Sequence, residues 1–326
     1  MRVFEHANYP FLSWRNRAYV ISAVLILAGI ASMVWNTVSR GSWLNYGVDF
    51  SGGTVVEVHF TRDVRVDELR SAASAAGEDW EINRFGSSNE FVVRMRAFEQ
   101  QAGQDAATRV TQVLSQRFQP AEFEIERTEA VGPKVGNELQ QRALLAILVS
   151  FAATLVYLWF RFEWRFGAAA ILATAHDILL TLGYLAVTQS EVSLGTVAAL
   201  LTIVGYSLND TIVVFDRIRE NLQKPRHGAS YLEVLNRSVN ETLPRTVLTG
   251  GGTLATLLAL YFLGGPVIRD FALILILGII IGTFSSLFVA TPVLYEIEKR
   301  WPHLGKKSPL RGPAGSGGRS RAPSTV

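Results

Sequence analysis

The sequence predicts a membrane α-helical bundle of six transmembrane helices that carries a small α+β, ferredoxin-like extracytoplasmic domain. The first observation is composition: of 326 residues, 49% are apolar and only 18% are charged, whereas soluble domains average about 25% charged residues. The mean hydropathy of +0.23 agrees with this. The second observation is a set of six apolar stretches long enough to cross a bilayer. The third is a run of strand-like alternations between the first two stretches.

Each expected span approaches or exceeds the roughly 20 mostly apolar residues that a helix needs to cross the hydrocarbon core. The spans are Ala18–Val38, Arg142–Phe160, Phe166–Val187, Val192–Phe215, Thr246–Gly264 and Ile268–Tyr295. The first could instead be a secretory signal peptide, because Arg15 and Arg17 precede it. Its apolar run exceeds the usual length of such a signal and no clean cleavage site follows, which favours an uncleaved anchor.

The distribution of basic residues predicts that both termini are cytoplasmic. Lysine and arginine are frequent in residues 1–17, 161–165, 217–245 and 299–321. The loop Thr188–Glu191, which falls on the opposite side, has none. Short loops rich in lysine and arginine stay in the cytoplasm. The long connection between the first two spans therefore lies outside, although it is acidic, because long loops cross regardless of charge.

The spans divide the chain into five expected parts. These are a cytoplasmic N-terminal segment (1–17), the first span (18–38), an extracytoplasmic domain (39–141), a five-helix bundle (142–296) and a basic tail (297–326). From residue 305 onward the tail is rich in glycine, proline and serine without an acidic residue, so we expect it to be disordered. Its positive charge favours contact with anionic membrane lipids, not with nucleic acid.

The extracytoplasmic domain combines four strand patterns with two helix patterns. Strands are expected at 54–60, 80–85, 90–95 and 122–127, and helices at 66–76 and 105–118. The resulting order, β-α-β-β-α-β, is that of the split βαβ, ferredoxin-like arrangement. The sequence contains no catalytic motif there, so we interpret the domain as a contact surface; alternatively, its helices only cover the sheet.

Several classes of active site are excluded or not expected. The chain has no cysteine, which excludes disulfides, thiol nucleophiles, iron–sulfur clusters and cysteine-ligated zinc. Its five histidines never occur at metal-ligand spacing, and no GxxxxGK[ST] phosphate loop is present. We therefore expect no enzyme, no cofactor and no nucleotide-driven motor in this chain.

Two pairs of polar residues lie inside expected spans: His176 with Asp177 in the third, and Asn209 with Asp210 in the fourth. An ionisable residue deep in a span costs about 2.5–3.5 kcal/mol on insertion scales and usually marks a pathway or a buried partner. A carboxyl group among apolar neighbours can exchange protons near neutral pH. The alternatives are a hydrogen bond between helices for Asp210 and a structural pair for His176 and Asp177.

Arg245, at the start of the fifth expected span, is the candidate cation for these acids. A carboxyl group near a cation can alternate between a paired ionised state and a released protonated state. Gly250, Gly251 and Gly252 follow, where missing side chains allow helices to approach closely. The alternative for Arg245 is an anchor that extends to the membrane interface.

Four motifs together resemble the SecF family, the membrane subunits of bacterial SecD–SecF protein-export complexes. They are Gly47–Gly53 (GVDFSGG), Val131–Leu139 (VGPKVGNEL), Ala175–Asp177 (AHD) and Ser207–Asn221 (SLNDTIVVFDRIREN). The first and the last are the most specific. The resemblance runs from about the first span to the sixth.

The resemblance implies one half of a transporter of the resistance–nodulation–division type, completed by a SecD partner. It further implies that proton flow across the bacterial cytoplasmic (inner) membrane assists late translocation of unfolded polypeptides, alongside the SecYEG channel and the ATPase SecA. Protons would be the coupling ion and no cofactor is implied. An intramembrane Asp–Arg pair in the proton path is matched by Asp210 and Arg245. Residues that match the family signature without an assigned chemistry are Gly47, Asp49, Gly52 and Gly53.

Two rival functions share this architecture. One is a proton-coupled small-molecule permease half, which usually needs a much larger outer domain than the roughly 100 residues expected here. The other is a passive scaffold of the translocase, in which the buried polar residues only join helices. Replacement of Asp210 by asparagine distinguishes the scaffold, because it removes titration but keeps size and hydrogen bonding.

Overall fold

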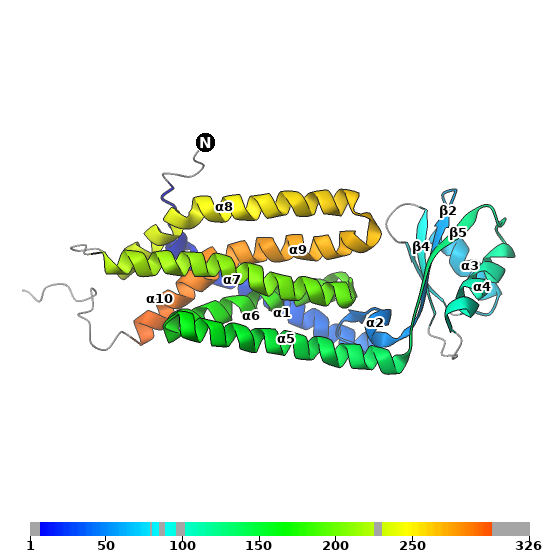
Figure 1. The fold of residues 1–326 in the computed structure, drawn as a ribbon, viewed down its shortest axis with the longest axis horizontal. Coiled ribbons are helices and arrows are strands. Elements are labelled where there is room, and N and C mark those ends of the chain that lie inside the picture. Colours follow the sequence, from blue (N-terminus) through cyan, green and yellow to red (C-terminus); the bar gives the residue numbers. More distant parts are fainter. Residues whose placement is uncertain (1–6, 79, 85–88, 96–101, 225–229, 302–326) are drawn as a thin grey trace, which may run out of the picture.

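The structure is a computed structural model that describes residues 7–78, 80–84, 89–95, 102–224 and 230–301. It has a long helical bundle with a small sheet domain at one end (Figure 1). We call this end of the bundle the domain end, and the opposite end, where the described chain begins and finishes, the terminal end. The expected tail lies outside the described residues from 302 onward.

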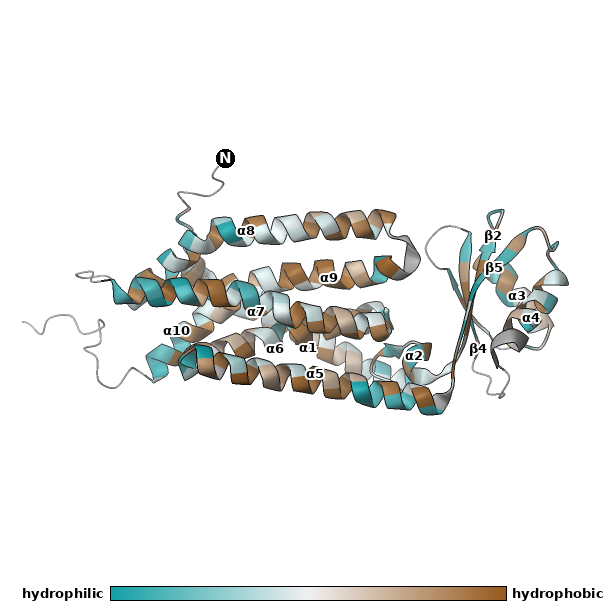
Figure 2. Ribbon diagram, viewed as in Figure 1, coloured by the Kyte–Doolittle hydropathy of each residue, from teal (hydrophilic) through white to brown (hydrophobic). Residues whose placement is uncertain are grey.

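Within the described residues, six helices are long and apolar enough to cross a membrane, which confirms the six expected spans. Brown, hydrophobic segments run along the bundle in Figure 2. The helices are α1 (Arg15–Arg40), α5 (Pro133–Arg161), α6 (Trp164–Thr188), α7 (Leu194–Gln223), α8 (Tyr231–Leu263) and α9 (Gly265–Ser285). A π-helical segment, η2 (Ser286–Ala290), joins α9 to α10 (Thr291–Arg300).

The observed helix ends differ from the expected spans, because hydropathy locates the apolar centre of a helix and not its caps. Helix α5 begins at Pro133, before the expected boundary at 142. Val192, expected in the fourth span, lies in the two-residue strand β6 (Glu191–Val192). Helix α7 starts only after Ser193, whose hydroxyl accepts the backbone N–H of Thr196 in a capping box.

The interior of the bundle is made by α6, α7 and the α9–α10 unit. About half of their most apolar residues are buried, compared with 17% in α1 and α8 and 6% in α5. Helices α1 and α6 approach closely where Gly29 faces Gly183, since a Cβ on Gly29 would lie 2.7 Å from the Gly183 Cα. The outer helices thus present apolar faces that only lipid or another protein could cover.

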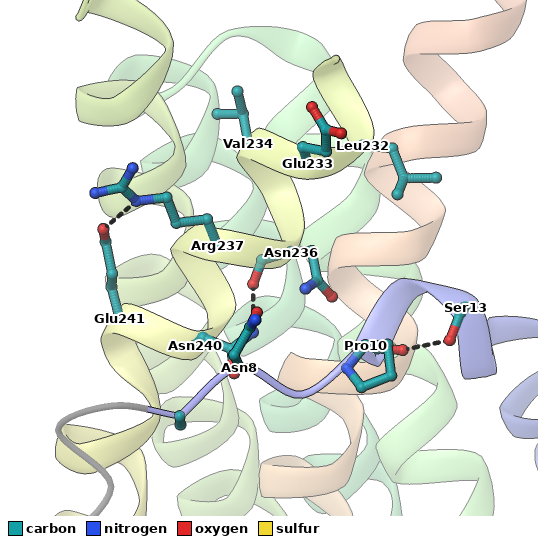
Figure 3. A pocket seen from close by; sticks show the side chains of 11 residues that line it. Asn8, Pro10, Ser13, Leu232, Glu233, Val234, Asn236, Arg237, Asn240 and Glu241 are labelled. Carbon is teal, nitrogen blue, oxygen red and sulfur yellow. Dashed lines mark hydrogen bonds and ion pairs between the residues drawn. The ribbon is translucent and has the colours of Figure 1, made fainter. Parts of the chain in front are cut away.

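Residues 7–14 run along the terminal end of α8 as a strap. The side chain of Asn240 accepts the backbone N–H of Tyr9 at 2.7 Å, and the amides of Asn236 and Asn240 both donate to the Tyr9 carbonyl. The short 3₁₀ helix η1 (Phe11–Trp14) follows. A cavity of about 540 Å³ lies between this strap and α8 (Figure 3).

The sheet domain contains four strands and two helices in the expected order. They are β2 (Gly53–Phe60), α3 (Val66–Ala75), β3 (Glu81–Arg84), β4 (Glu90–Met95), α4 (Ala102–Ser115) and β5 (Phe123–Val131). The strands lie in the order β3-β4-β2-β5, and each neighbouring pair is antiparallel. Helices α3 and α4 cover one face, where Val56, Val58 and Phe60 join the domain core. The uncovered face is turned toward the bundle (Figure 1).

Glu57 lies on the uncovered face in the central strand β2, and partial burial raises its pKa above the usual range. The carboxylates of Glu129, Glu126 and Glu90 raise the pKa further, whereas Arg127 opposes them. The folded protein therefore holds this proton more tightly than the unfolded chain does. Consequently, the free energy of unfolding of the sheet falls as the pH rises through the raised pKa.

We expect Glu57→Gln to slow amide hydrogen exchange in β2, β4 and β5 at pH 7, because the variant no longer ionises a partly buried group. The difference in exchange rate between the variant and the parent should be smaller at pH 4, because the parent carboxyl is then mostly protonated in both the folded and the unfolded protein. Hydrogen exchange on the full chain in detergent measures this, with the exposed Glu124→Gln as the control. An equal gain at both pH values would contradict the explanation.

Candidate functional site

Asp210 lies at the junction of three helical segments, and hydroxyl groups hold both of its carboxylate oxygens. The side chain is 8% exposed on α7. The Thr246 hydroxyl on α8 donates to Oδ1 at 2.6 Å, and the Ser286 hydroxyl on η2 donates to Oδ2 at 2.5 Å. Because π-helical turns often occur at functional sites, the position of Ser286 at the start of η2 is informative.

Asp177, on α6, is fully buried, and both of its carboxylate oxygens also have side-chain partners. Its Oδ1 lies 2.9 Å from His176 Nδ1, and the Ser207 hydroxyl on α7 donates to Oδ2 at 2.5 Å. The other ring nitrogen of His176, Nε2, lies 2.9 Å from the Ser22 hydroxyl on α1. These contacts join α1, α6 and α7 in the middle of the bundle.

The two acid sites are adjacent. Ser207, which binds Asp177, lies three residues before Asp210 and therefore on the same side of α7. Ser285, next to Ser286, contacts the Asp177 side chain as well. A band of polar side chains thus extends from α1 across the bundle to Thr246 on α8. The hydroxyl groups of this band both donate and accept hydrogen bonds, so they can bond to the two acids in more than one orientation.

The structure does not bring every predicted site residue into this band. His176, Asp177 and Asp210 are buried in it, but Asn209 is exposed on α7. The Arg245 side chain is exposed on α8, and no ion pair joins it to Asp210 among the described residues. Its neighbour Thr246 makes the contact instead.

The expected close approach at the three glycines of α8 involves mainly the first. Gly250 is buried, and a Cβ there would lie 3.5 Å from the Thr283 hydroxyl of α9. Gly251 and Gly252 face open space in this chain.

Sequence reasoning missed the hydroxyl residues of the site, namely Ser22, Ser207, Thr246, Ser285 and Ser286. Single serines and threonines are common in apolar helices, so hydropathy does not single them out. Two features of the sequence could have indicated these hydroxyl residues: the three-residue spacing of Ser207 and Asp210, and the Ser285–Ser286 pair inside the last apolar stretch.

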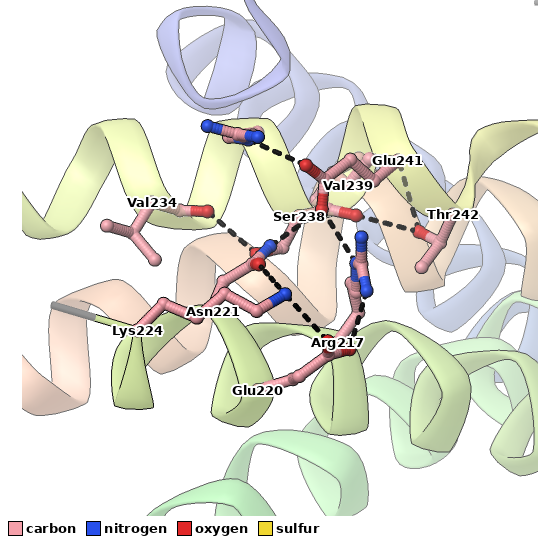
Figure 4. A network of polar contacts seen from close by, with 10 residues as sticks. Arg217, Glu220, Asn221, Lys224, Val234, Ser238, Val239, Glu241 and Thr242 are labelled. Carbon is pink, nitrogen blue, oxygen red and sulfur yellow. Dashed lines mark hydrogen bonds and ion pairs between the residues drawn. The ribbon is translucent and has the colours of Figure 1, made fainter. Parts of the chain in front are cut away.

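At the terminal end, a network of charged and polar side chains fastens α7 to α8 (Figure 4). The guanidinium of Arg217 donates to Glu241 at 2.6 Å, and the Asn221 amide donates to both Glu241 and Ser238. Arg237 donates to the second oxygen of Glu241 at 2.6 Å. The two helices that carry Asp210 and Thr246 are thereby fixed to each other at one end.

At the domain end, the glycine-rich segment Gly47–Gly53 forms an elbow between the sheet and α7. It contains the short helix α2 (Val48–Ser51). The preceding strand β1 (Asn45–Tyr46) pairs in parallel with β6, and the Gly47 N–H donates to the Val192 carbonyl at 2.9 Å. The Asp49 carboxylate accepts the backbone N–H of Leu194 at 2.8 Å, at the first residue of α7. A carboxylate there is favourable for the helix N-terminus.

The backbone geometry and close contacts of the elbow require glycine at Gly47, Gly52 and Gly53. A Cβ on Gly47 would collide with the carboxylate of Glu191. Gly52 and Gly53 have positive φ angles of 71° and 125°, and a Cβ on Gly53 would lie 2.8 Å from the Met95 carbonyl oxygen. Other residues rarely adopt such conformations.

Among the described residues, no group of three or more potential ligands is placed to hold a metal ion.

Comparison with known proteins places these features in one family. Residues 110–300 match the family model of the SecD/SecF protein export membrane protein C-terminal region, and residues 41–64 match that of the SecD/SecF GG motif. The second match includes the whole elbow, and the first includes both buried acids.

Relatives match along most of the chain. The chain is 44% identical to the protein translocase subunit SecF of Gemmatimonas aurantiaca, over 95% of this chain and 93% of that protein. It is 40% identical to the subunit SecF of Escherichia coli O157:H7, over 91% and 90%. The crystal structure of SecDF, a translocon-associated membrane protein from Thermus thermophilus, has a TM-score of 0.78 and 36% identity. The match covers 92% of this chain but only 40% of that one.

We expect Gly53→Ala to destabilise the protein by about 1–3 kcal/mol, because alanine would be forced into a left-handed backbone conformation against the Met95 carbonyl. Thermal unfolding in detergent measures the loss. Gly205→Ala is the matched control, since Gly205 lies within α7 with open space around it and alanine favours a helix. A Gly53→Ala variant as stable as the control would contradict this account of the elbow.

Proposed function

This chain belongs to the SecF group of the SecD/SecF family of protein export membrane proteins, and we propose that it is a proton-coupled subunit of a SecD–SecF complex. In this proposal, the complex uses the proton motive force to assist late steps of protein translocation across the cytoplasmic membrane. SecYEG, SecA and the unfolded polypeptide are the proposed partners in that process. The chain itself acts without enzymatic chemistry and without a cofactor, with protons as the coupling ion.

The observation that carries the proposal is the hydroxyl shell of Asp210. An ionised carboxylate accepts hydrogen bonds from Thr246 and Ser286, as seen here. A protonated carboxyl can instead donate to one of the same hydroxyls, because a hydroxyl rotates and both donates and accepts. The site therefore accommodates both protonation states, whereas a shell of backbone N–H groups would favour only the ionised one.

Arg245 fits this proposal as a cation that approaches Asp210 in only part of the cycle. Its exposed side chain lies on the same helix as Thr246, one residue away. A rotation of α8 about its axis, or a change of the Arg245 rotamer, would replace the neutral hydroxyl of Thr246 by the charged guanidinium of Arg245 as the partner of Asp210. The apolar faces exposed on α1, α5 and α8 are evidence for the proposed second half, SecD, which would cover them.

The proposed orientation puts the terminal end in the cytoplasm, because the basic residues of the short loops gather there. The sheet domain then lies outside the membrane. Its strand order and antiparallel pairing support a ferredoxin-like assignment. A proton that crosses 100 mV releases about 2.3 kcal/mol, which is enough to bias a small rearrangement of this domain.

We expect Asp210→Asn to abolish the part of export that depends on the proton motive force, because asparagine keeps the size of the side chain but cannot titrate. The measurement is export into inverted membrane vesicles that contain the variant together with SecD. Asp216→Asn is the matched control, since Asp216 is an exposed acid on the same helix that pairs with Arg161 at 2.9 Å. Normal export by Asp210→Asn, at normal abundance, would instead favour a passive scaffold.

A further inference from the structure

An ion pair links the uncovered face of the sheet domain directly to the segment that precedes α7. Arg94 on β4 pairs with Glu191 on β6. The Arg94 side chain is 15% exposed and that of Glu191 33% exposed, so water reaches the pair only in part. The two residues are 97 positions apart in the sequence, and neither belongs to a motif that the sequence singled out.

Glu191 lies just before α7, the helix that carries Asp210, and hydrogen bonds hold this segment in place. It pairs with Asn45 in the β1–β6 ladder, and Ser193, two residues later, caps α7. Asp49 bonds to the first residue of α7 from the elbow, and Gly47 leaves room for the Glu191 carboxylate. A force on Glu191 therefore acts on the beginning of α7.

Within the described part of the chain, the sheet also contacts the elbow through apolar side chains. These include a cluster of three valines: Val48 on α2, Val55 on β2 and Val92 on β4. The covalent links pass through glycines on both sides: Gly52 and Gly53 at the beginning of β2, and Gly132 between β5 and α5. Hinges commonly consist of a few such residues at the ends of elements.

We propose that Arg94 and Glu191 are positioning residues that couple the sheet domain to α7. The pair holds the domain against the bundle in one state of the cycle and separates in another, so that a change at Asp210 is transmitted along α7 to the domain. This inference rests on the proposed function, because it supposes that Asp210 exchanges protons during export.

A charge exchange tests the pair itself. We expect Arg94→Glu and Glu191→Arg each to lower export several-fold in vesicles with SecD, and the double variant to recover at least half of the loss. The control is Glu138 with Arg142, an exposed pair within α5, whose exchange should leave export unchanged. If the double variant is no better than the singles at equal abundance, the pairing has no role in coupling.

A reversible crosslink tests whether the contact must open. Because the chain has no cysteine, an Arg94→Cys/Glu191→Cys variant reacts only at the two introduced positions. We expect the reduced variant to keep partial export. Crosslinking with a bifunctional methanethiosulfonate should lower export to the level of Asp210→Asn, and reductant should restore it. The Glu138→Cys/Arg142→Cys variant, crosslinked within one helix, should be unaffected.

The outcomes separate the two proposals. If the crosslinked protein exports as well as the reduced one while Asp210→Asn is inactive, the coupling inference is wrong and the proposed function stands. If Asp210→Asn exports normally, the proposed function fails, and the coupling inference fails with it.

Discussion

The structure depends on the need to satisfy two acidic side chains inside a bundle that hydrocarbon surrounds. Lipid provides no hydrogen bonds, so an unsatisfied polar group there costs several kcal/mol. Hydroxyls from neighbouring helices hold both oxygens of Asp210, through Thr246 and Ser286, whereas Asp177 is held by the Ser207 hydroxyl and the His176 ring. These contacts fix the relative rotation of α6, α7, α8 and η2. Hydroxyls both donate and accept, so the contacts that fold the bundle are also compatible with the proton exchange proposed for Asp210.

Helix α7 is the element through which a local change at Asp210 could act at a distance. The network around Glu241 fastens its terminal end to α8, and Asp49 and the β1–β6 ladder hold its beginning at the elbow. At the domain end, the Arg94–Glu191 pair joins the sheet to the segment that precedes α7. Exposed ion pairs contribute about 0–1 kcal/mol, and in a partly buried pair such as Arg94–Glu191 the cost of desolvation offsets part of the attraction. A proton that crosses 100 mV supplies about 2.3 kcal/mol, which exceeds the contribution of an exposed ion pair.

The sequence predicted the six spans and the order of elements in the sheet domain, because apolar length and strand alternation are local properties. It also identified the acids Asp177 and Asp210, since charge is conspicuous in an apolar helix. It could not reveal their partners, because a serine such as Ser286 acquires its role only when η2 is packed against α7. Likewise, Gly47 and Asp49 could be matched to a family but not explained, since Glu191 and Leu194 lie more than 140 residues away. The pairing of Arg245 with Asp210 stays a prediction.

The most direct test of the account is the protonation state of Asp210 itself. Infrared difference spectroscopy on the full chain with SecD, in vesicles, would follow the band of the protonated carboxyl, assigned by its loss in Asp210→Asn. The account predicts that this band appears and disappears as the pH changes across the physiological range. A band that stays constant throughout that range would show that the group does not exchange protons, and would contradict the account.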